Sequence, residues 1–111
     1  MNNLHLSKEA QNDLAEIKAY ITEELENPDT ALATISRITK KIRILKNQAN
    51  VGTPLSSVAD TESDYRFLVS GNYLVFYRAY GKDVYIDRVL YGRRDYMRIL
   101  FGDAQSDETD E

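Results

Sequence analysis

Residues 65–98 read YRFLVSGNYLVFYRAYGKDVYIDRVLYGRRDYMR, and this stretch decides the fold of the 111-residue chain. Three runs in it are rich in aromatic and β-branched side chains, which favour strands: 65–69, 73–80 and 84–91. Gly71-Asn72 separates the first two runs, and glycine tolerates the positive φ of a tight hairpin turn. A second turn is expected at residues 81–83. The stretch therefore predicts a three-stranded antiparallel meander.

Alternation of side chains along these strands gives the predicted sheet two faces. A two-residue loop at 71–72 and a three-residue loop at 81–83 would pair Leu74 with both Val69 and Leu90. The face expected to form the core carries Phe67, Val69, Leu74, Phe76, Val84, Ile86 and Leu90. The other face is mixed and is the expected functional face: Arg66, Leu68, Ser70, Tyr73, Val75, Tyr77, Asp87, Val89 and Tyr91. A one-residue error in either loop would move side chains to the opposite face.

The chain before the meander predicts a short edge strand and two helices. Residues 3–6 alternate, and Ser7 is a plausible N-cap for a helix. The apolar stripe of that helix recurs at three- and four-residue steps: Ala10, Leu14, Ile17, Ile21 and Leu25. Asn27 and Pro28 then suit the cap and the first position of a second helix, whose stripe is Leu32, Ile35, Ile38, Ile42 and Leu45. So short a break predicts an antiparallel helical hairpin.

The remaining segments complete one α+β domain at residues 1–102. Residues 47–64 are expected to be loop, because glycine, proline and serine recur there. The segment after the meander predicts one or two helical turns. Four of its side chains are too apolar for solvent, so they must dock on the core or bind a partner: Met97, Ile99, Leu100 and Phe101. An N-terminal edge strand and the helical hairpin would then pack on the meander, followed by a short C-terminal helix and a disordered acidic tail at 103–111.

Composition excludes several classes of function. The chain contains no cysteine, so no disulfide or thiolate metal site is expected. No apolar run approaches the roughly 20 residues of a membrane helix, and no secretory signal is evident. We therefore expect a cytoplasmic protein without a cofactor, a metal ion or a membrane contact.

The basic residues are unevenly distributed although the net charge is −4. Residues 65–102 hold seven of the fourteen lysines and arginines against three acids, and arginine suits bidentate contacts to anions. The second helix carries a further basic group, Arg37, Lys40, Lys41, Arg43 and Lys46. An anionic partner would explain the first group, and so would solvated strand ends with local ion pairs. The second group suggests a nucleic acid, and a solvated face near a helix C-terminus explains it more simply.

The order of elements resembles the RelE/ParE superfamily of bacterial toxins. The resemblance covers residues 3–101 and rests on these elements: Leu14, Ile17 and Tyr20, then Glu26-Asn27-Pro28, Tyr65-Arg66, Gly71-Asn72-Tyr73 and RVLYGRRD at 88–95. It implies the toxin of a type II toxin–antitoxin system, a growth inhibitor with a role in plasmid stabilisation. A small antitoxin would hold the toxin inactive in a hetero-oligomer.

One branch of this superfamily cuts messenger RNA on the ribosome. Such chemistry needs a base for the 2′-hydroxyl, cations for the charge that develops and an acid for the leaving oxygen. Arg66 and Arg94 match two of the cationic positions, whereas the other two fall on Leu68 and Tyr73. A ribosome-dependent endoribonuclease would have to use Arg66, Tyr77, Arg94 and Tyr96 as its catalytic residues.

The Tyr-Gly-Arg-Arg-Asp ending is more similar to the ParE branch, which poisons DNA gyrase and leaves DNA breaks. The two lost cations and the acidic composition also disfavour a ribosome-bound enzyme. We therefore expect a non-catalytic gyrase inhibitor whose target surface is Arg93, Arg94, Tyr96 and Arg98. The antitoxin is expected to cover Met97, Ile99, Leu100 and Phe101. Two alternatives remain: a structural ion pair of Arg94 with Asp95, and a non-toxic descendant that only binds its antitoxin.

Overall fold

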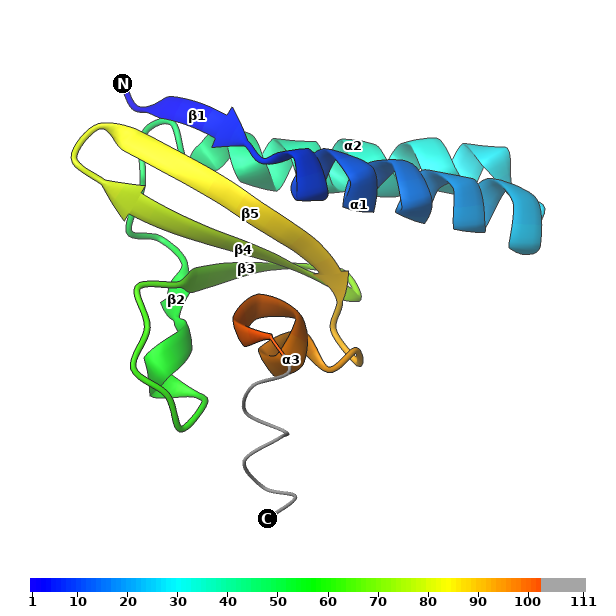
Figure 1. Cartoon of the computed structure of the whole chain (residues 1–111). Helices are drawn as coiled ribbons and strands as arrows, with labels where there is room; N and C mark the ends of the chain where they lie inside the picture. Colours follow the sequence, from blue (N-terminus) through cyan, green and yellow to red (C-terminus); the bar gives the residue numbers. More distant parts are fainter. Residues whose placement is uncertain (103–111) are drawn as a thin grey trace, which may run out of the picture.

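A computed structural model describes residues 1–102 and contains a mixed sheet with helices on both faces (Figure 1). The elements in chain order are β1 (Asn3–Leu6), α1 (Lys8–Ala19), a π-helical segment (Tyr20–Glu24), α2 (Pro28–Ile44), β2 (Thr53–Pro54), a 3₁₀ turn (Leu55–Ser57), β3 (Arg66–Ser70), β4 (Tyr73–Tyr80), β5 (Asp83–Tyr91) and α3 (Tyr96–Phe101). The strand order is β1-β5-β4-β3-β2, with β1 parallel to β5 and the other pairs antiparallel. The predicted α+β class, edge strand, helical hairpin, meander and C-terminal helix are confirmed. The tail predicted at 103–111 lies outside the described residues.

The caps of the helical hairpin form as predicted. The Ser7 hydroxyl accepts a hydrogen bond from the Ala10 backbone N–H at 2.9 Å, and the Asn27 side chain accepts one from the Thr30 N–H at 3.1 Å. Pro28 occupies the first position of α2, where its missing N–H costs nothing. These local bonds fix where each helix begins.

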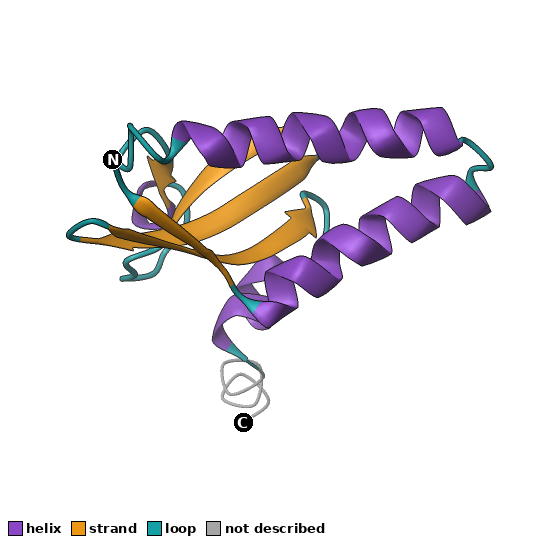
Figure 2. Ribbon diagram, turned by 90° about the horizontal axis from the view of Figure 1, so that it is seen from above, coloured by secondary structure: helices purple, strands orange, loops and turns teal. Residues whose placement is uncertain are grey.

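The apolar stripes of the two helices differ from the prediction at the tip of the hairpin. Leu25 and Leu32 are 56% and 59% exposed, because the tip projects past the ends of the strands (Figure 2). The positions that pack inward also include small and polar side chains: Asp13, Ala31 and Thr34. A stripe is buried only where the sheet lies beneath it.

The β4–β5 hairpin contains a bulge that the sequence did not indicate. Tyr80 pairs with Asp83, so the turn has two residues, not the predicted three. Further along, the register shifts between Phe76 and Tyr77, and Asp87 is the extra residue. The shorter turn and the bulged residue compensate each other, so the predicted pairing of Leu74 with Leu90 is confirmed.

The assignment of the two sheet faces was wrong. The helical hairpin covers the face that we expected to be mixed and functional, and its buried members include Leu68, Val75, Tyr77 and Val89. Val84 and Ile86 join that face because they lie beyond the bulge. The face expected to be the core carries a smaller cluster of Phe76, Leu90 and Leu55, covered by α3 and the 3₁₀ turn. Alternation identifies two apolar faces but does not say which one the larger helices cover.

Residues 47–64 are mostly loop, as predicted, and contain β2 and the 3₁₀ turn as their only regular elements. β2 pairs with β3, and the segment before it closes over Tyr77. The buried Tyr77 hydroxyl donates to the Ala49 carbonyl at 2.8 Å and accepts from the Gly52 N–H at 2.9 Å. A Cβ on Gly52 would lie 2.6 Å from that hydroxyl oxygen and 2.9 Å from the Phe67 carbonyl. Gly52 is therefore required by close approach.

Gly52→Ala is accordingly expected to lower the free energy of unfolding by about 1–3 kcal/mol, the usual cost of overpacking. Urea denaturation measures the loss. The same substitution in a Tyr77→Phe background should cost less, because the nearest clashing atom is gone. Wild-type stability for Gly52→Ala would contradict the close approach.

Candidate functional site

The turn between β5 and α3 presents two arginines to solvent. Arg93 and Arg94 are both exposed, and within residues 1–102 neither guanidinium makes a side-chain hydrogen bond or ion pair. The backbone beneath them is held: the Gly92 N–H donates to the Asn72 carbonyl at 2.8 Å and the Arg94 N–H to the Tyr91 carbonyl at 3.0 Å. The turn thus holds two positive charges in place without neutralising them.

Asp95 does not pair with Arg94. Its carboxylate caps α3 by accepting from the Arg98 N–H at 3.3 Å, and it lies 3.7 Å from the Arg98 Nε. The ion pair expected as an alternative role for Arg94 is therefore replaced by one within α3. Arg94 is left available to a partner.

α3 packs on the sheet face opposite the helical hairpin. The Tyr96 ring lies 5.3 Å from the Phe76 ring, and Phe101 meets Tyr65 edge-on at 5.9 Å. The four residues predicted to bind the antitoxin are half-buried in this cluster: Met97, Ile99, Leu100 and Phe101. Docking on the core, one of the two expected fates, is what the structure contains. Only part of each side chain remains for the antitoxin.

Arg94 also borders an aromatic groove that the sequence reasoning missed. The groove, of about 570 Å³, lies between the end of the first helix and the end of the β4–β5 pair that carries Tyr73 and Tyr91, and Glu16, Tyr20 and Leu25 also line it. Tyr73 and Tyr91 meet edge-on at 5.9 Å, and burial raises the pKa of Tyr73. A second hollow of about 260 Å³ shares Leu25 and Tyr73 and extends to Arg37. The two hollows adjoin at Leu25 and Tyr73, and both polar and apolar side chains line them.

The four residues that a ribonuclease would need are not gathered in one place. Arg66 and Tyr77 are cross-strand partners, but Arg66 donates to the Gly52 carbonyl at 2.8 Å and the Tyr77 hydroxyl is buried with two partners. Arg94 stands at the opposite end of β4, beside Tyr73. Tyr96 packs on Phe76, so it lies on the other face of the sheet from Tyr77.

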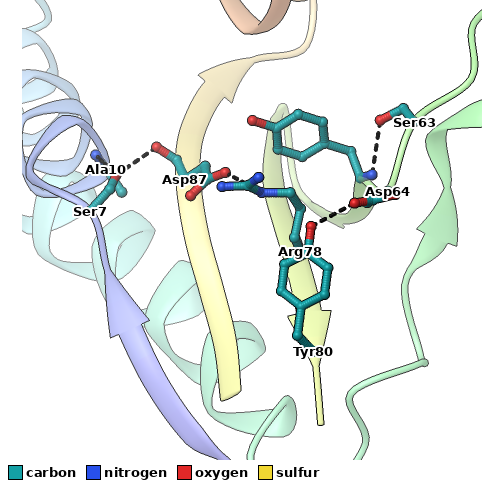
Figure 3. Close-up of polar contacts among 8 residues, drawn as sticks. Ser7, Ala10, Ser63, Asp64, Arg78, Tyr80 and Asp87 are labelled. Carbon is teal, nitrogen blue, oxygen red and sulfur yellow. Dashed lines mark hydrogen bonds and ion pairs between the residues drawn. The ribbon is translucent and has the colours of Figure 1, made fainter. Parts of the chain in front are cut away.

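A polar network that no sequence pattern indicated lies on the α3 face (Figure 3). Arg78 Nε donates to the Asp87 carboxylate at 2.8 Å, and the Ser7 hydroxyl donates to the Asp87 carbonyl at 2.7 Å. The Tyr80 hydroxyl donates to Asp64 at 2.6 Å. The Arg78 guanidinium lies 5.4 Å from the Tyr65 ring centroid. Because Asp87 is the bulged residue, only the register shift reveals this network, which joins β4, β5 and the start of α1.

The network predicts a loss of stability in alkali. Burial, reinforced by the Asp87 carboxylate, raises the pKa of Tyr65 from 10.0 to about 12. The unfolded chain loses this proton near pH 10 while the folded chain keeps it, so the stabilisation is complete below pH 10 and is lost between pH 10 and 12. Denaturation midpoints measured across that window should fall less steeply for Tyr65→Phe than for wild type. Tyr85→Phe is the control, and identical slopes for Tyr65→Phe and wild type would contradict the assignment.

One buried ion pair ties the helical hairpin to the sheet. Asp13 is only 5% exposed, and its carboxylate accepts two hydrogen bonds from Arg88, both at 2.8 Å, and a third from the Val89 N–H at 2.9 Å. The sequence signal was a carboxylate three residues after Ala10 and four before Ile17, hence on the apolar stripe. Asp13 also lines the aromatic groove, so the pair positions one wall of it.

The described part of the chain contains neither a metal-binding cluster nor a membrane-spanning helix. No group of three or more carboxylate or imidazole side chains in residues 1–102 is arranged to hold a metal ion. No helix in that part of the chain combines the length and hydrophobicity of a membrane span.

Comparison with known proteins identifies the family. The family model described as the ParE toxin of the type II toxin–antitoxin system, parDE, matches residues 4–96. The chromosomal ParDE system of P. aeruginosa shares the fold, with a TM-score of 0.67 at 24% identity over 82% of this chain and 96% of that one. YafQ of E. coli strain BL21(DE3) is 16% identical over 92% of this chain and 100% of that one, and its TM-score of 0.48 supports no conclusion. No curated protein matches. Because the family model spans most of the sequence, the chain belongs to the ParE toxin family of type II toxin–antitoxin systems.

Proposed function

We propose that this toxin inhibits growth in the bacterial cytoplasm by binding and poisoning DNA gyrase, and that its cognate antitoxin prevents this. The observation that carries the proposal is the anchored turn with two unneutralised arginines. Arg93 and Arg94 stand beside α3, which adds Tyr96 and Arg98 to the same surface. Fixed cations suit charge-assisted contacts to carboxylates of a protein target. Membership of the ParE family supports gyrase as that target.

Binding fits this surface better than catalysis does. A ribonuclease must hold its acid, base and cations around one phosphate. Here Tyr77 is buried with both hydrogen-bonding capacities used, and Tyr96 lies across the sheet from it. The alternative of a ribosome-dependent endoribonuclease therefore has no support from the geometry.

The antitoxin is proposed to contact the α3 side of the molecule through the exposed parts of Met97, Ile99, Leu100 and Phe101. Such contacts would cover the neighbouring Arg93 and Arg94 and so block the target surface. The aromatic groove beside Arg94 is a second place where the same antitoxin chain can bind. Both surfaces adjoin Arg94, which explains how one small partner neutralises the toxin.

Regulated expression in a bacterial host tests the proposal, with a DNA-damage reporter and radiolabelled translation followed together. We expect a damage response while translation is still intact, and inhibition of purified gyrase. Arg93→Ala/Arg94→Ala should lower the potency by about 150-fold or more, because two lost charge-assisted contacts cost about 3–6 kcal/mol together. Its unfolding midpoint should equal that of wild type.

Lys82→Ala is the matched control, since Lys82 is an exposed cation in a different turn. It should leave potency unchanged. An immediate stop in translation without DNA damage would favour the ribonuclease. Normal growth under full expression would leave only the antitoxin-binding role.

A further inference from the structure

A strongly basic surface follows α2 on the side away from the core. Between residues 30 and 59 the chain has five basic residues and no acidic one. All five are exposed, and we call them the α2 basic face: Arg37, Lys40, Lys41, Arg43 and Lys46. The net charge of −4 hides this surface, because five of the eighteen acids lie at 103–111 and residues 1–102 carry fourteen bases and thirteen acids.

The α2 basic face takes no part in ion pairs of the fold. Within residues 1–102, the buried or structured arginines Arg78 and Arg88 each have a carboxylate partner. Among the described residues 1–102, the only side-chain hydrogen bond or ion pair of the α2 basic face is a 3.4 Å hydrogen bond from Arg37 to the Thr34 hydroxyl. A helix C-terminus favours cations only within its last turn. That effect accounts for Arg43 and Lys41 but leaves Arg37 and Lys40 without a role in the fold.

The spacing of these cations suits a nucleic-acid backbone. Arg37, Lys40 and Arg43 recur every three residues, opposite the buried stripe that includes Ile38 and Ile42. From residue 37 to residue 43 the helix rises about 9 Å at 1.5 Å per residue, a length over which duplex DNA carries about five phosphates. One helix face can therefore neutralise several phosphates at once.

The composition of α2 favours a nucleic-acid duplex over a single strand or a peptide, because α2 has no aromatic side chain and its basic part has almost no exposed apolar one. The sequence of α2, PDTALATISRITKKIRI, has no aromatic side chain, whereas single-stranded nucleic acids are bound mainly by base stacking on aromatic rings. Between residues 37 and 46, Ile44 is the single exposed large apolar side chain, whereas a peptide-binding surface needs apolar anchors. Of these partners, the regularly spaced phosphates of a duplex match the α2 basic face best.

We infer that the α2 basic face binds the phosphate backbone of duplex DNA without reading its sequence. This goes beyond the proposed function, which requires contact with gyrase alone. α2 and α3 lie on opposite sides of the sheet (Figure 1), so one toxin molecule can hold DNA on one side and gyrase on the other. Gyrase works on duplex DNA, and a toxin tethered to that DNA meets the enzyme at a raised effective concentration.

Salt-dependent DNA binding by the purified full-length chain tests the inference, with gyrase absent. The probe is a fluorescent 20-base-pair duplex followed by anisotropy between about 50 and 200 mM NaCl. We expect log K to fall linearly with log salt with a slope near −4, about 0.9 for each phosphate neutralised. Arg37→Gln/Lys40→Gln/Arg43→Gln should reduce that slope by about 3. Lys8→Gln/Lys18→Gln/Lys82→Gln, a matched set of exposed lysines elsewhere, should leave it unchanged.

Several results would overturn the inference. One is a failure to bind the duplex at the lowest salt concentration, and another is an equal loss of salt slope in the two triple variants. A third is tighter binding of a single-stranded RNA or of a glutamate-rich peptide than of the duplex. Salt-sensitive self-association abolished by the α2 variant would instead assign this face to a second copy, whose α1 region is acidic. Because gyrase is absent, failure here leaves the gyrase proposal standing, and failure of the gyrase assay leaves this result standing.

Discussion

Asp13→Ala is expected to lower the free energy of unfolding by about 3–5 kcal/mol, the usual cost of removing one partner from a buried ion pair. The substitution strips Arg88 of both hydrogen bonds and leaves the Val89 N–H without its acceptor. The Arg88 side chain is only 24% exposed, so water replaces the lost partner poorly. Urea denaturation followed by circular dichroism measures the loss.

Two further substitutions separate charge from hydrogen bonding at this position. Glu16→Ala, at an exposed carboxylate one turn later in α1, should change stability by less than about 0.5 kcal/mol. Asp13→Asn keeps an acceptor for the Val89 N–H and should fall between wild type and Asp13→Ala. If Asp13→Ala were as stable as Glu16→Ala, the pair would contribute nothing to holding α1 on the sheet.

Phe76→Ala is expected to cost about 3–5 kcal/mol as well, by opening a cavity under α3. Phe76 is fully buried and contacts the rings of Tyr96 and Phe67 at 5.3 and 6.1 Å. Its loss removes the surface on which α3 packs. We therefore expect a lower denaturation midpoint together with faster proteolysis within residues 96–101.

Val69→Ala is the control for Phe76→Ala. Val69 lies on the neighbouring strand β3 and on the same face of the sheet, but it is 52% exposed. It should change neither stability nor proteolysis appreciably. Protection of residues 96–101 that survives Phe76→Ala would mean that α3 is held by Asp95 and the turn before it, and not by the aromatic cluster.

The elements with local signals were predicted correctly. Ser7, Asn27 and Pro28 fix the helix starts through bonds to residues three positions away or less, and Gly71 permits the first hairpin with a φ of 58°. Val84 and Ile86 were assigned to the wrong face because their side depends on one bulged residue, Asp87, which looks like any other polar strand position in the sequence. The sheet is also covered on both faces, so its apolar residues do not tell which face the helical hairpin covers.

The target surface predicted from the sequence consists of residues that are close together in the chain. Arg93 and Arg94 follow the last strand, and the structure places them in an exposed turn before a capped helix. The aromatic groove was missed because Tyr20 and Tyr73 come together only when the hairpin lies across the sheet. The bond between Asp13 and Arg88 spans 75 residues, and no local pattern indicates it.

The pairing of the first strand with the last has a consequence for synthesis. Asn3 pairs with Asp83, and a ribosome that adds about 5–20 residues per second needs roughly 4–16 s to make the intervening chain. During that time α1 and α2 have no sheet to cover, and the Arg93–Arg94 turn does not yet exist. Chains that end before residue 93 therefore lack the surface proposed to bind the target.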